Sequence, residues 1–92
     1  MLGVRGDSMA PDLQDGDLCF VDTGRKWDGP GIYVMNWNGA AIVKRLIPEI
    51  ATGRLAIVSS NPAYPVEHVA PDQIDSLHIG GRVVAAWTLK KL

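Results

Sequence analysis

The chain has 92 residues, a length at which a protein forms one hydrophobic core. Its 47% hydrophobic and 21% charged residues exclude a disordered chain, and a net charge of −1 excludes the basic excess of a free-standing nucleic-acid binder. A single cysteine, Cys19, excludes an internal disulfide, and no apolar run approaches the roughly 20 residues of a membrane span. We therefore expect one cytoplasmic domain over residues 1–92 that does not contact a membrane.

Short runs of β-branched and aromatic residues alternate with Gly and Pro, which leaves little room for a long helix. Asn38-Gly39 separates two of these runs and favours a type I′ hairpin turn. The only helical candidate is one or two turns after Ser8, because Ser8 can cap a helix and Pro11 suits an early helical position. The sequence predicts a mostly β domain. Its predicted strands are Leu2–Arg5, Leu18–Asp22, Ile32–Trp37, Ala40–Leu46, Arg54–Val58, Val66–Val69 and His78–Trp87.

Candidate metal ligands are few and widely spaced. His68 and His78 are separated by ten positions, and Cys19 is distant from both, so the sequence contains no cluster with metal-ligand spacing. Three aspartates in the range 12–17 lack the ligand spacing and the closing glutamate of an EF-hand loop, and we interpret them as turn formers. We therefore expect neither a metal ion nor another cofactor.

The tetrapeptide Gly6-Asp7-Ser8-Met9 is the strongest candidate for a nucleophile. A serine on a sharp bend can be exposed beside backbone N–H groups, so that one short segment supplies both the nucleophile and its oxyanion hole. The alternative interpretation is that Ser8 only caps a helix. A nucleophilic serine also needs a base, and the chain offers a histidine and a lysine for this role.

The two candidate bases imply different enzymes. His78 ends the string Asp75-Ser76-Leu77-His78, which resembles the Asp-x-x-His of the Gly-Asp-Ser-Leu esterases, but those larger α/β proteins carry Gly and Asn blocks that this chain lacks. Lys44 shares a strand face with Ile42 and Leu46, and burial there would lower its pKa so that the neutral amine can accept a proton. The alternative is that Lys44 faces solvent on an edge strand.

Several blocks of residues follow one another in a recognisable order from Val4 to Trp87. They are Val4-Arg5-Gly6-Asp7-Ser8-Met9-Ala10-Pro11-Asp12-Leu13, Asp15-Gly16-Asp17, Gly31-Ile32-Tyr33-Val34, Val43-Lys44-Arg45-Leu46, Ser59-Ser60-Asn61-Pro62-Ala63-Tyr64-Pro65 and Ile79-Gly80-Gly81-Arg82-Val83-Val84. Together they resemble the C-terminal domain of LexA-like repressors, a group that includes the lambda-type phage repressors and the UmuD mutagenesis proteins. The resemblance implies a small, largely antiparallel β fold and a Ser-Lys dyad that performs self-cleavage.

The resemblance also implies roles for single residues. Ser8 is expected to be the nucleophile and Lys44 the general base. The backbone N–H groups of Asp7 and Ser8 are expected to form the oxyanion hole, and Met9 and Pro11 to shape the substrate groove. Type I signal peptidases share the Ser-Met-x-Pro-x-Leu and Lys-Arg blocks, so a signal peptidase-like catalytic domain stays open as an alternative.

The family further implies partners. In it, an N-terminal helix-turn-helix domain binds operator DNA, the C-terminal domain forms a homodimer, and activated RecA filaments stimulate cleavage. Only seven residues precede Ser8 and no Ala-Gly or Cys-Gly dipeptide occurs, so we expect the chain to be a fragment of a longer repressor. We expect Val83, Val84, Trp87 and Leu89 to contribute to the dimer interface. A domain that only dimerises, with its dyad unused, remains a second alternative.

Overall fold

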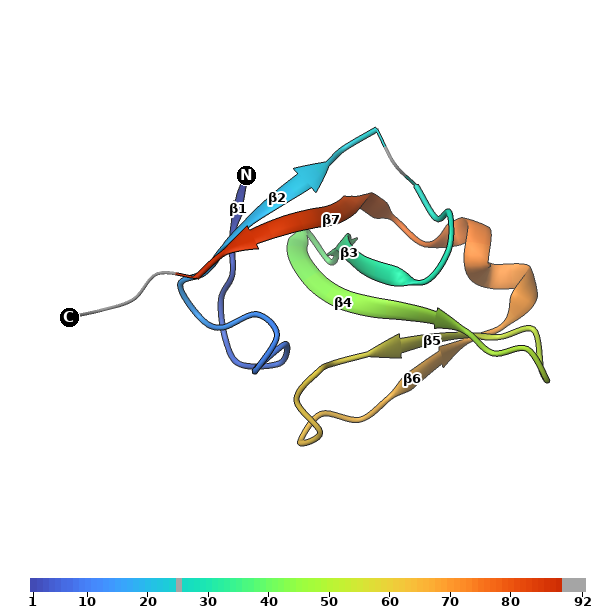
Figure 1. Ribbon diagram of the computed structural model, residues 1–92. Coiled ribbons are helices and arrows are strands. Elements are labelled where there is room, and N and C mark those ends of the chain that lie inside the picture. Colours follow the sequence, from blue (N-terminus) through green and yellow to red (C-terminus); the bar gives the residue numbers. More distant parts are fainter. Residues whose placement is uncertain (25, 89–92) are drawn as a thin grey trace.

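The computed structural model describes residues 1–24 and 26–88, and these form one seven-stranded sheet in the order β1-β2-β7-β3-β4-β5-β6 (Figure 1). Every pair of neighbouring strands is antiparallel, which confirms the mostly β, largely antiparallel fold. The elements are β1 (Leu2–Gly3), β2 (Leu18–Asp22), β3 (Gly31–Trp37), β4 (Ala40–Pro48), β5 (Leu55–Val58), β6 (Glu67–Val69), the 3-10 helix η1 (Pro71–Ser76) and β7 (Ile79–Trp87).

The β3–β4 hairpin has the two-residue loop that the sequence predicts. Asn38 and Gly39 both adopt positive φ angles, of 49° and 81°, as a type I′ turn requires. The turn fixes the register, in which Trp37 pairs with Ala40 and Tyr33 pairs with Lys44. The hairpin therefore determines which β4 side chains share a face with which β3 side chains.

The segment after Ser8 has no more than the short helical turn that the sequence predicts, but the sequence missed the helix η1. After Ser8 the chain makes hydrogen-bonded turns, with the Leu13 N–H donating to the Met9 carbonyl at 2.8 Å, and it does not continue into a helix. The helix of the described residues is η1, which connects β6 to β7 and has a proline in its first turn. The predicted first strand is also too long, since β1 ends at Gly3.

Acidic side chains stabilise the loop between β1 and β2. The Gly6 N–H donates to Asp15 Oδ1, and the Gln14 N–H donates to Asp17 Oδ2, both at 2.8 Å. The Asp17 contact occupies the Gln14 N–H, which a helix continuing from Ser8 would use for its own hydrogen bond. The two contacts confirm Asp15 and Asp17 as turn formers and explain why the segment folds as a loop.

Two hydrophobic clusters lie on the sheet. Neighbouring β4 residues contribute to different clusters, Val43 to the first and Ile42 and Leu46 to the second, as strand alternation requires. The buried members of the first cluster are Val4, Met9, Leu13 and Cys19, and those of the second are Tyr33, Met35, Leu46 and Leu55. The first cluster thus anchors the loop that carries Ser8 onto the sheet.

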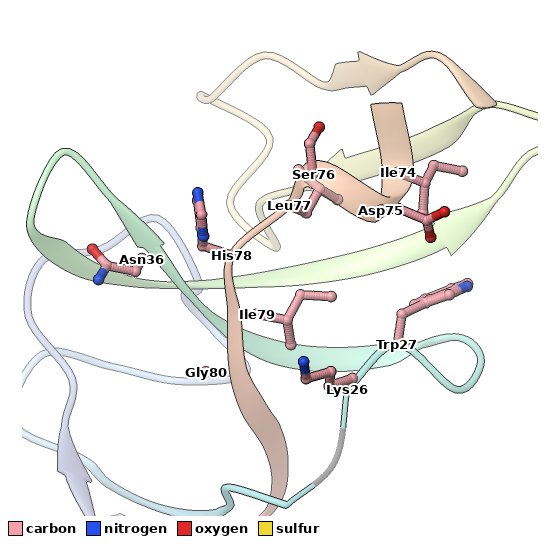
Figure 2. Close-up of a pocket in the computed structure, with 10 residues that line it drawn as sticks. All are labelled: Lys26, Trp27, Asn36, Ile74, Asp75, Ser76, Leu77, His78, Ile79 and Gly80. Carbon is pink, nitrogen blue, oxygen red and sulfur yellow. The ribbon is translucent and has the colours of Figure 1, made fainter. Parts of the chain in front are cut away.

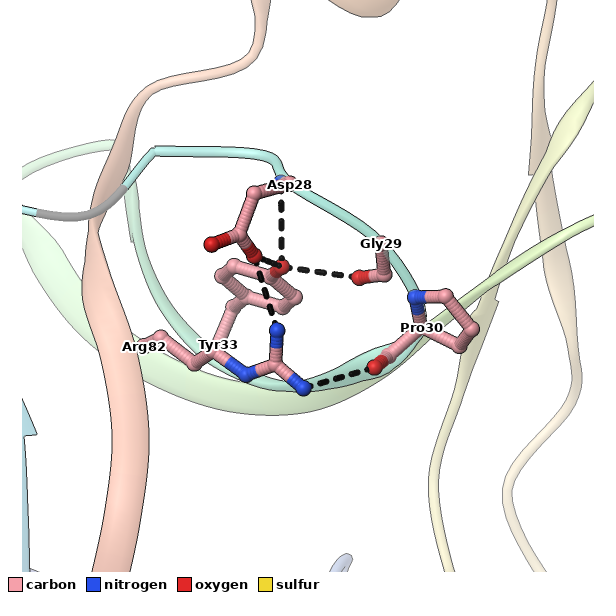
Figure 3. A network of polar contacts seen from close by, with 5 residues as sticks. All are labelled: Asp28, Gly29, Pro30, Tyr33 and Arg82. Carbon is pink, nitrogen blue, oxygen red and sulfur yellow. Dashed lines mark hydrogen bonds and ion pairs between the residues drawn. The ribbon is translucent and has the colours of Figure 1, made fainter.

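A polar network attaches the β2–β3 loop to β3 and β7 (Figure 3). The hydroxyl of the fully buried Tyr33 lies 2.8 Å from both Asp28 Oδ1 and the Gly29 carbonyl oxygen. The Arg82 guanidinium from β7 forms an ion pair with Asp28 at 2.8 Å and donates to the Pro30 carbonyl at 2.9 Å. Burial raises the pKa of Tyr33, which keeps this hydroxyl protonated as a donor.

Candidate active site

Ser8 lies in a turn whose backbone contacts the loop between β5 and β6, hereafter the β5–β6 loop. The Asn61 N–H donates to the Ser8 carbonyl at 2.9 Å, and the Asn61 side-chain amide donates to the Asp7 carbonyl at 3.1 Å. Among the hydrogen bonds of the described residues, none uses the N–H of Asp7 or of Ser8 as a donor. Both N–H groups are therefore available to a ligand, beside a half-buried Ser8 side chain.

Lys44 lies in β4 and its amine Nζ donates to the Ser59 hydroxyl oxygen at 2.8 Å. The side chain is half-buried, and desolvation lowers the pKa of Lys44, while the negative charge of Glu67 opposes this shift. The strand pattern predicted a lysine that is removed from solvent, and the half-buried Lys44 side chain agrees with this prediction. No hydrogen bond joins Lys44 to Ser8 among the described residues.

Ser8 and Lys44 line the same cavity, which has a volume of about 330 Å³. One wall consists of residues 2–5 with Ser8 and Met9, and the other consists of β4 residues 41–44. Met9 is 2% exposed, so it supports the cavity wall from within the first hydrophobic cluster. Pro11 is exposed and does not line this cavity, so the structure does not bring it to the proposed groove.

Further side-chain contacts connect the β5–β6 loop to the serine turn. The Ser60 hydroxyl donates to Asp12 Oδ2 at 2.7 Å, and Arg45 from β4 lies 3.3 Å from the same oxygen. The Ser60 hydrogen bond is the main cause of the lowered pKa of Asp12. The Tyr64 hydroxyl donates to the Asp7 carboxylate, and this hydrogen bond raises the pKa of Tyr64.

Sequence reasoning assigned no role to the residues of this loop that reach the site. Ser59 lies opposite Lys44 because the pairing of Arg45 with Val58 continues by one residue. The sequence alone does not give this register of β5 against β4. The ring of Tyr64, with its centroid 5.5 Å from the Lys44 amine, has no sequence signal either, because it lies beyond the strand.

A larger cavity of about 670 Å³ lies elsewhere, between η1, β7 and the start of the β2–β3 loop (Figure 2). His78 and Asp75 line it together with Lys26 and Trp27, whereas Ser8 lines the smaller cavity. The two cavities share no lining residue, so the structure does not place His78 beside Ser8. The esterase arrangement is therefore not supported.

The other residues considered as metal ligands or nucleophiles have environments that suit a structural role. Cys19 is buried, and burial raises the pKa of its thiol, which disfavours the reactive thiolate. His68 Nδ1 lies at hydrogen-bond distance, 2.8 Å, from Glu49 Oε1 near the surface. Within residues 1–24 and 26–88, no three His, Cys, Asp or Glu side chains converge as a metal site would require. Nor does this part of the chain contain a helix able to cross a membrane.

Comparison with known proteins decides the family. The family model described as Peptidase S24-like matches residues 1–84, nearly the whole chain. This chain belongs to the Peptidase S24-like family. The chain is also 38% identical over 85 residues to the 26 kDa repressor protein of Escherichia phage HK022, a match that covers 91% of this chain and 35% of that protein. No solved structure matches the chain significantly.

Membership of the S24 family confirms the resemblance to LexA-like repressors and narrows the chemistry. The S24 family is a family of serine peptidases. The phage relative is a repressor, and the chain spans about a third of its length.

Proposed function

We propose that this S24 domain is a serine endopeptidase that cleaves a peptide segment of its own repressor, with Ser8 as nucleophile and Lys44 as general base. One observation carries the proposal: Ser8 and Lys44 line one cavity of about 330 Å³, and desolvation there lowers the pKa of the lysine. A lysine with a lowered pKa has a larger fraction of neutral amine at a given pH than a solvated lysine has, and the neutral amine is the form that can accept a proton.

The chemical steps follow from these two groups. The Ser8 oxygen attacks the carbonyl carbon of the scissile peptide bond, and its proton passes to the neutral Lys44 amine. The resulting ammonium then protonates the leaving amine, the C–N bond breaks, and an acyl-serine ester remains. Water hydrolyses this ester, with Lys44 again accepting a proton, and the free serine is restored.

The tetrahedral intermediate carries an oxyanion that needs hydrogen-bond donors. The N–H groups of Asp7 and Ser8 are the proposed donors, and their lack of other acceptors within the described structure supports this role. Asn61 supports the role of Ser8 further, since its side-chain amide donates to the Asp7 carbonyl and so restrains the peptide unit that carries the Ser8 N–H.

The shape of the cavity favours an extended peptide as substrate. β5 pairs with β4 only from Arg45 to Pro48, so residues 41–44 have no strand partner on that edge within the described sheet. A strand edge of this kind can pair with an extended peptide through backbone hydrogen bonds. The opposite wall, residues 2–5, would enclose the peptide from its other side.

We propose that the domain acts as a homodimer in the cytoplasm, within a repressor whose separate N-terminal domain binds operator DNA. Exposed apolar residues on β7 support the dimer, because Val84 is 55% and Trp87 64% exposed. Leu89, the fourth residue predicted for this interface, lies outside the described residues. A RecA filament is the proposed stimulus for cleavage, by analogy with the family.

A second candidate function is dimerisation without proteolysis. The observation that favours it is the contact of Lys44 with Ser59 in place of Ser8. In this alternative the lysine is a structural residue and the serine is never activated. The two candidates differ in whether Ser8 reacts as a nucleophile.

A fluorophosphonate probe tests that difference on the chain itself. The Ser8 oxygen would bond to phosphorus, fluoride would leave, and Lys44 would take the hydroxyl proton. Mass spectrometry should find one adduct on Ser8 that forms faster as the pH rises from 6 to 9. Ser8→Ala should abolish the adduct, Lys44→Ala should slow it by about 100-fold or more, and His78→Ala should match the wild type.

A chimera tests cleavage of a peptide bond. The chain would replace the matching 85 residues of the HK022 repressor, and the product would be incubated at alkaline pH. Two fragments on a gel, absent from the Ser8→Ala chimera, would support self-cleavage. An unmodified Ser8 in the probe experiment together with an intact chimera would instead support the dimerisation-only function.

A further inference from the structure

Ser59 is unusual among the polar residues of this chain because it is buried. Of the residues that the structure describes, only Asp17 and Ser59 are polar and buried, and Ser59 is 9% exposed. Asp17 accepts hydrogen bonds from backbone N–H groups in the loop after β1, as a turn former does. Ser59 instead accepts its hydrogen bond from the Lys44 amine, at 2.8 Å.

The sheet register explains this contact. Continuing the pairing of Arg45 with Val58 by one residue sets Ser59 opposite Lys44, so both side chains leave the same face of the sheet. The Ser59 oxygen is one carbon from the backbone, so it is confined to the few positions that rotation about χ1 allows relative to β4. The long lysine side chain, by contrast, has many rotamers and needs such a confined partner to hold its amine in one position.

We propose that Ser59 is a positioning residue that fixes the Lys44 amine at the cavity shared with Ser8; this inference rests on the proposed function. A neutral amine has two N–H bonds and one lone pair. Donating one N–H to Ser59 restrains rotation of the amine, so that the lone pair can remain available to the Ser8 hydroxyl proton. Ser59 itself contacts no reacting atom.

The same contact acts on the charge of the lysine. The Ser59 oxygen accepts a stronger hydrogen bond from an ammonium than from a neutral amine, so it favours the charged form. The other groups that face Lys44 are Glu67 from β6, Tyr64 from the β5–β6 loop and Tyr33, its partner on β3. Removing the Ser59 oxygen should therefore make the amine easier to deprotonate, whereas admitting water to the site would do the opposite.

Two measurements on the same chain test the proposal. The first follows acetylation of Lys44 by trace acetic anhydride between pH 6 and 11, which reads the fraction of neutral amine at each pH. The second follows the rate at which the fluorophosphonate probe modifies Ser8. The variants are Ser59→Ala, the conservative Ser59→Thr, and Ser76→Ala, a matched control whose hydroxyl donates to the Gln73 carbonyl in η1.

Ser59→Ala should move the midpoint of Lys44 acetylation to lower pH by about one unit. The limiting rate of Ser8 modification at high pH should nevertheless fall by about tenfold, since the amine is neutral but no longer held in place. Ser59→Thr should restore both values, and Ser76→Ala should match the wild type. A lower midpoint combined with a lower limiting rate is a result that loosened packing alone would not produce.

An unchanged midpoint in Ser59→Ala would overturn the proposal, as would a midpoint that moves to higher pH, because the latter would mean that Ser59 only excludes water. An unchanged limiting rate would also overturn it. Failure of the proposed function is distinguishable: wild-type Ser8 would then not react with the probe at all, whereas the acetylation midpoint of Lys44 would still report on Ser59.

Discussion

The Lys44 amine lies 5.5 Å from the centroid of the Tyr64 ring, while the hydroxyl of the same tyrosine donates to the Asp7 carboxylate. One side chain thus contacts the proposed base through its ring and the residue before the proposed nucleophile through its oxygen. The ring face attracts the ammonium form of the lysine, and the hydroxyl restrains the turn that carries Ser8.

Substitutions at Tyr64 should separate these two contacts. Tyr64→Leu removes the ring, so the midpoint of Lys44 acetylation should fall by about half a pH unit. Tyr64→Phe retains the ring and loses only the hydrogen bond to Asp7, so its midpoint should match the wild type. The same midpoint in both variants would show that the ring does not act on the lysine charge.

The lowered pKa of Lys44 predicts how stability depends on pH. The unfolded chain has a lysine pKa of about 10.4, and between the folded and unfolded values it binds more protons than the folded chain. Wild-type stability should therefore gain a positive contribution as pH rises through this window. Below the folded pKa the lysine is charged in both states, and its desolvation cost is constant and largest.

Lys44→Met should remove that cost. Near pH 6, Lys44→Met should unfold at a higher urea concentration than the wild type. This difference in urea midpoint should become smaller towards pH 10. The loss of the partner of Ser59 reduces the gain, but it does not change this trend. The matched control is Lys26→Met, because Lys26 is exposed. If the difference in urea midpoint between Lys44→Met and the wild type did not vary with pH, Lys44 would be a solvated lysine.

Gly81 occupies a position where a side chain has no room. A Cβ atom there would lie 2.6 Å from the backbone carbonyl oxygen of Asp22, which cannot move without disturbing β2. Gly81→Ala should therefore destabilise the chain by about 1–3 kcal/mol in urea unfolding. Gly3→Ala, where nothing lies within 4 Å of a new Cβ, should cost less than half as much. An equal loss of unfolding free energy in Gly81→Ala and Gly3→Ala would show that β2 and β7 can move apart to admit the new Cβ atom.

Trp87 should contribute to association. Its ring is 64% exposed and packs edge-on against Phe20 at a centroid distance of 6.3 Å, which leaves most of an indole in water. Sedimentation should show a dimer that dissociates on dilution, and Trp87→Glu should weaken it by about tenfold or more. Trp37→Glu at the tip of the β3–β4 hairpin is the control, since Trp37 is similarly exposed. A wild-type chain that stays monomeric at high concentration would contradict this prediction.

The elements that the sequence predicted well are those fixed by local chemistry. Asn38-Gly39 determines a hairpin by its backbone preferences alone, and alternation along β4 correctly grouped Ile42 with Leu46. The segment after Ser8 stays short because the Asp17 carboxylate accepts from the Gln14 N–H, which a longer helix would use for its own hydrogen bond. η1 was missed because six residues are too few to show a helical period.

The candidate site was predictable only in part. The residue types at Ser8 and Lys44, together with the family resemblance, were enough to nominate both residues, and the structure places them around one cavity. The contact of Lys44 with Ser59 was not predictable, because it depends on the register of β5 against β4. That register depends on the β4–β5 connection, whose residues carry no turn motif as definite as Asn38-Gly39.

The position of β7 in the sheet determines when, during synthesis, the sheet can form as a whole. Among the described residues, β7 is the last strand, yet it lies between β2 and β3 and joins β1 and β2 to the remaining four strands. The two walls of the Ser8 cavity come from opposite sides of this junction. Sheet pairing therefore joins the strands that carry these walls only after Ile79–Trp87 has been synthesised, so under the proposed function β7 would complete the site.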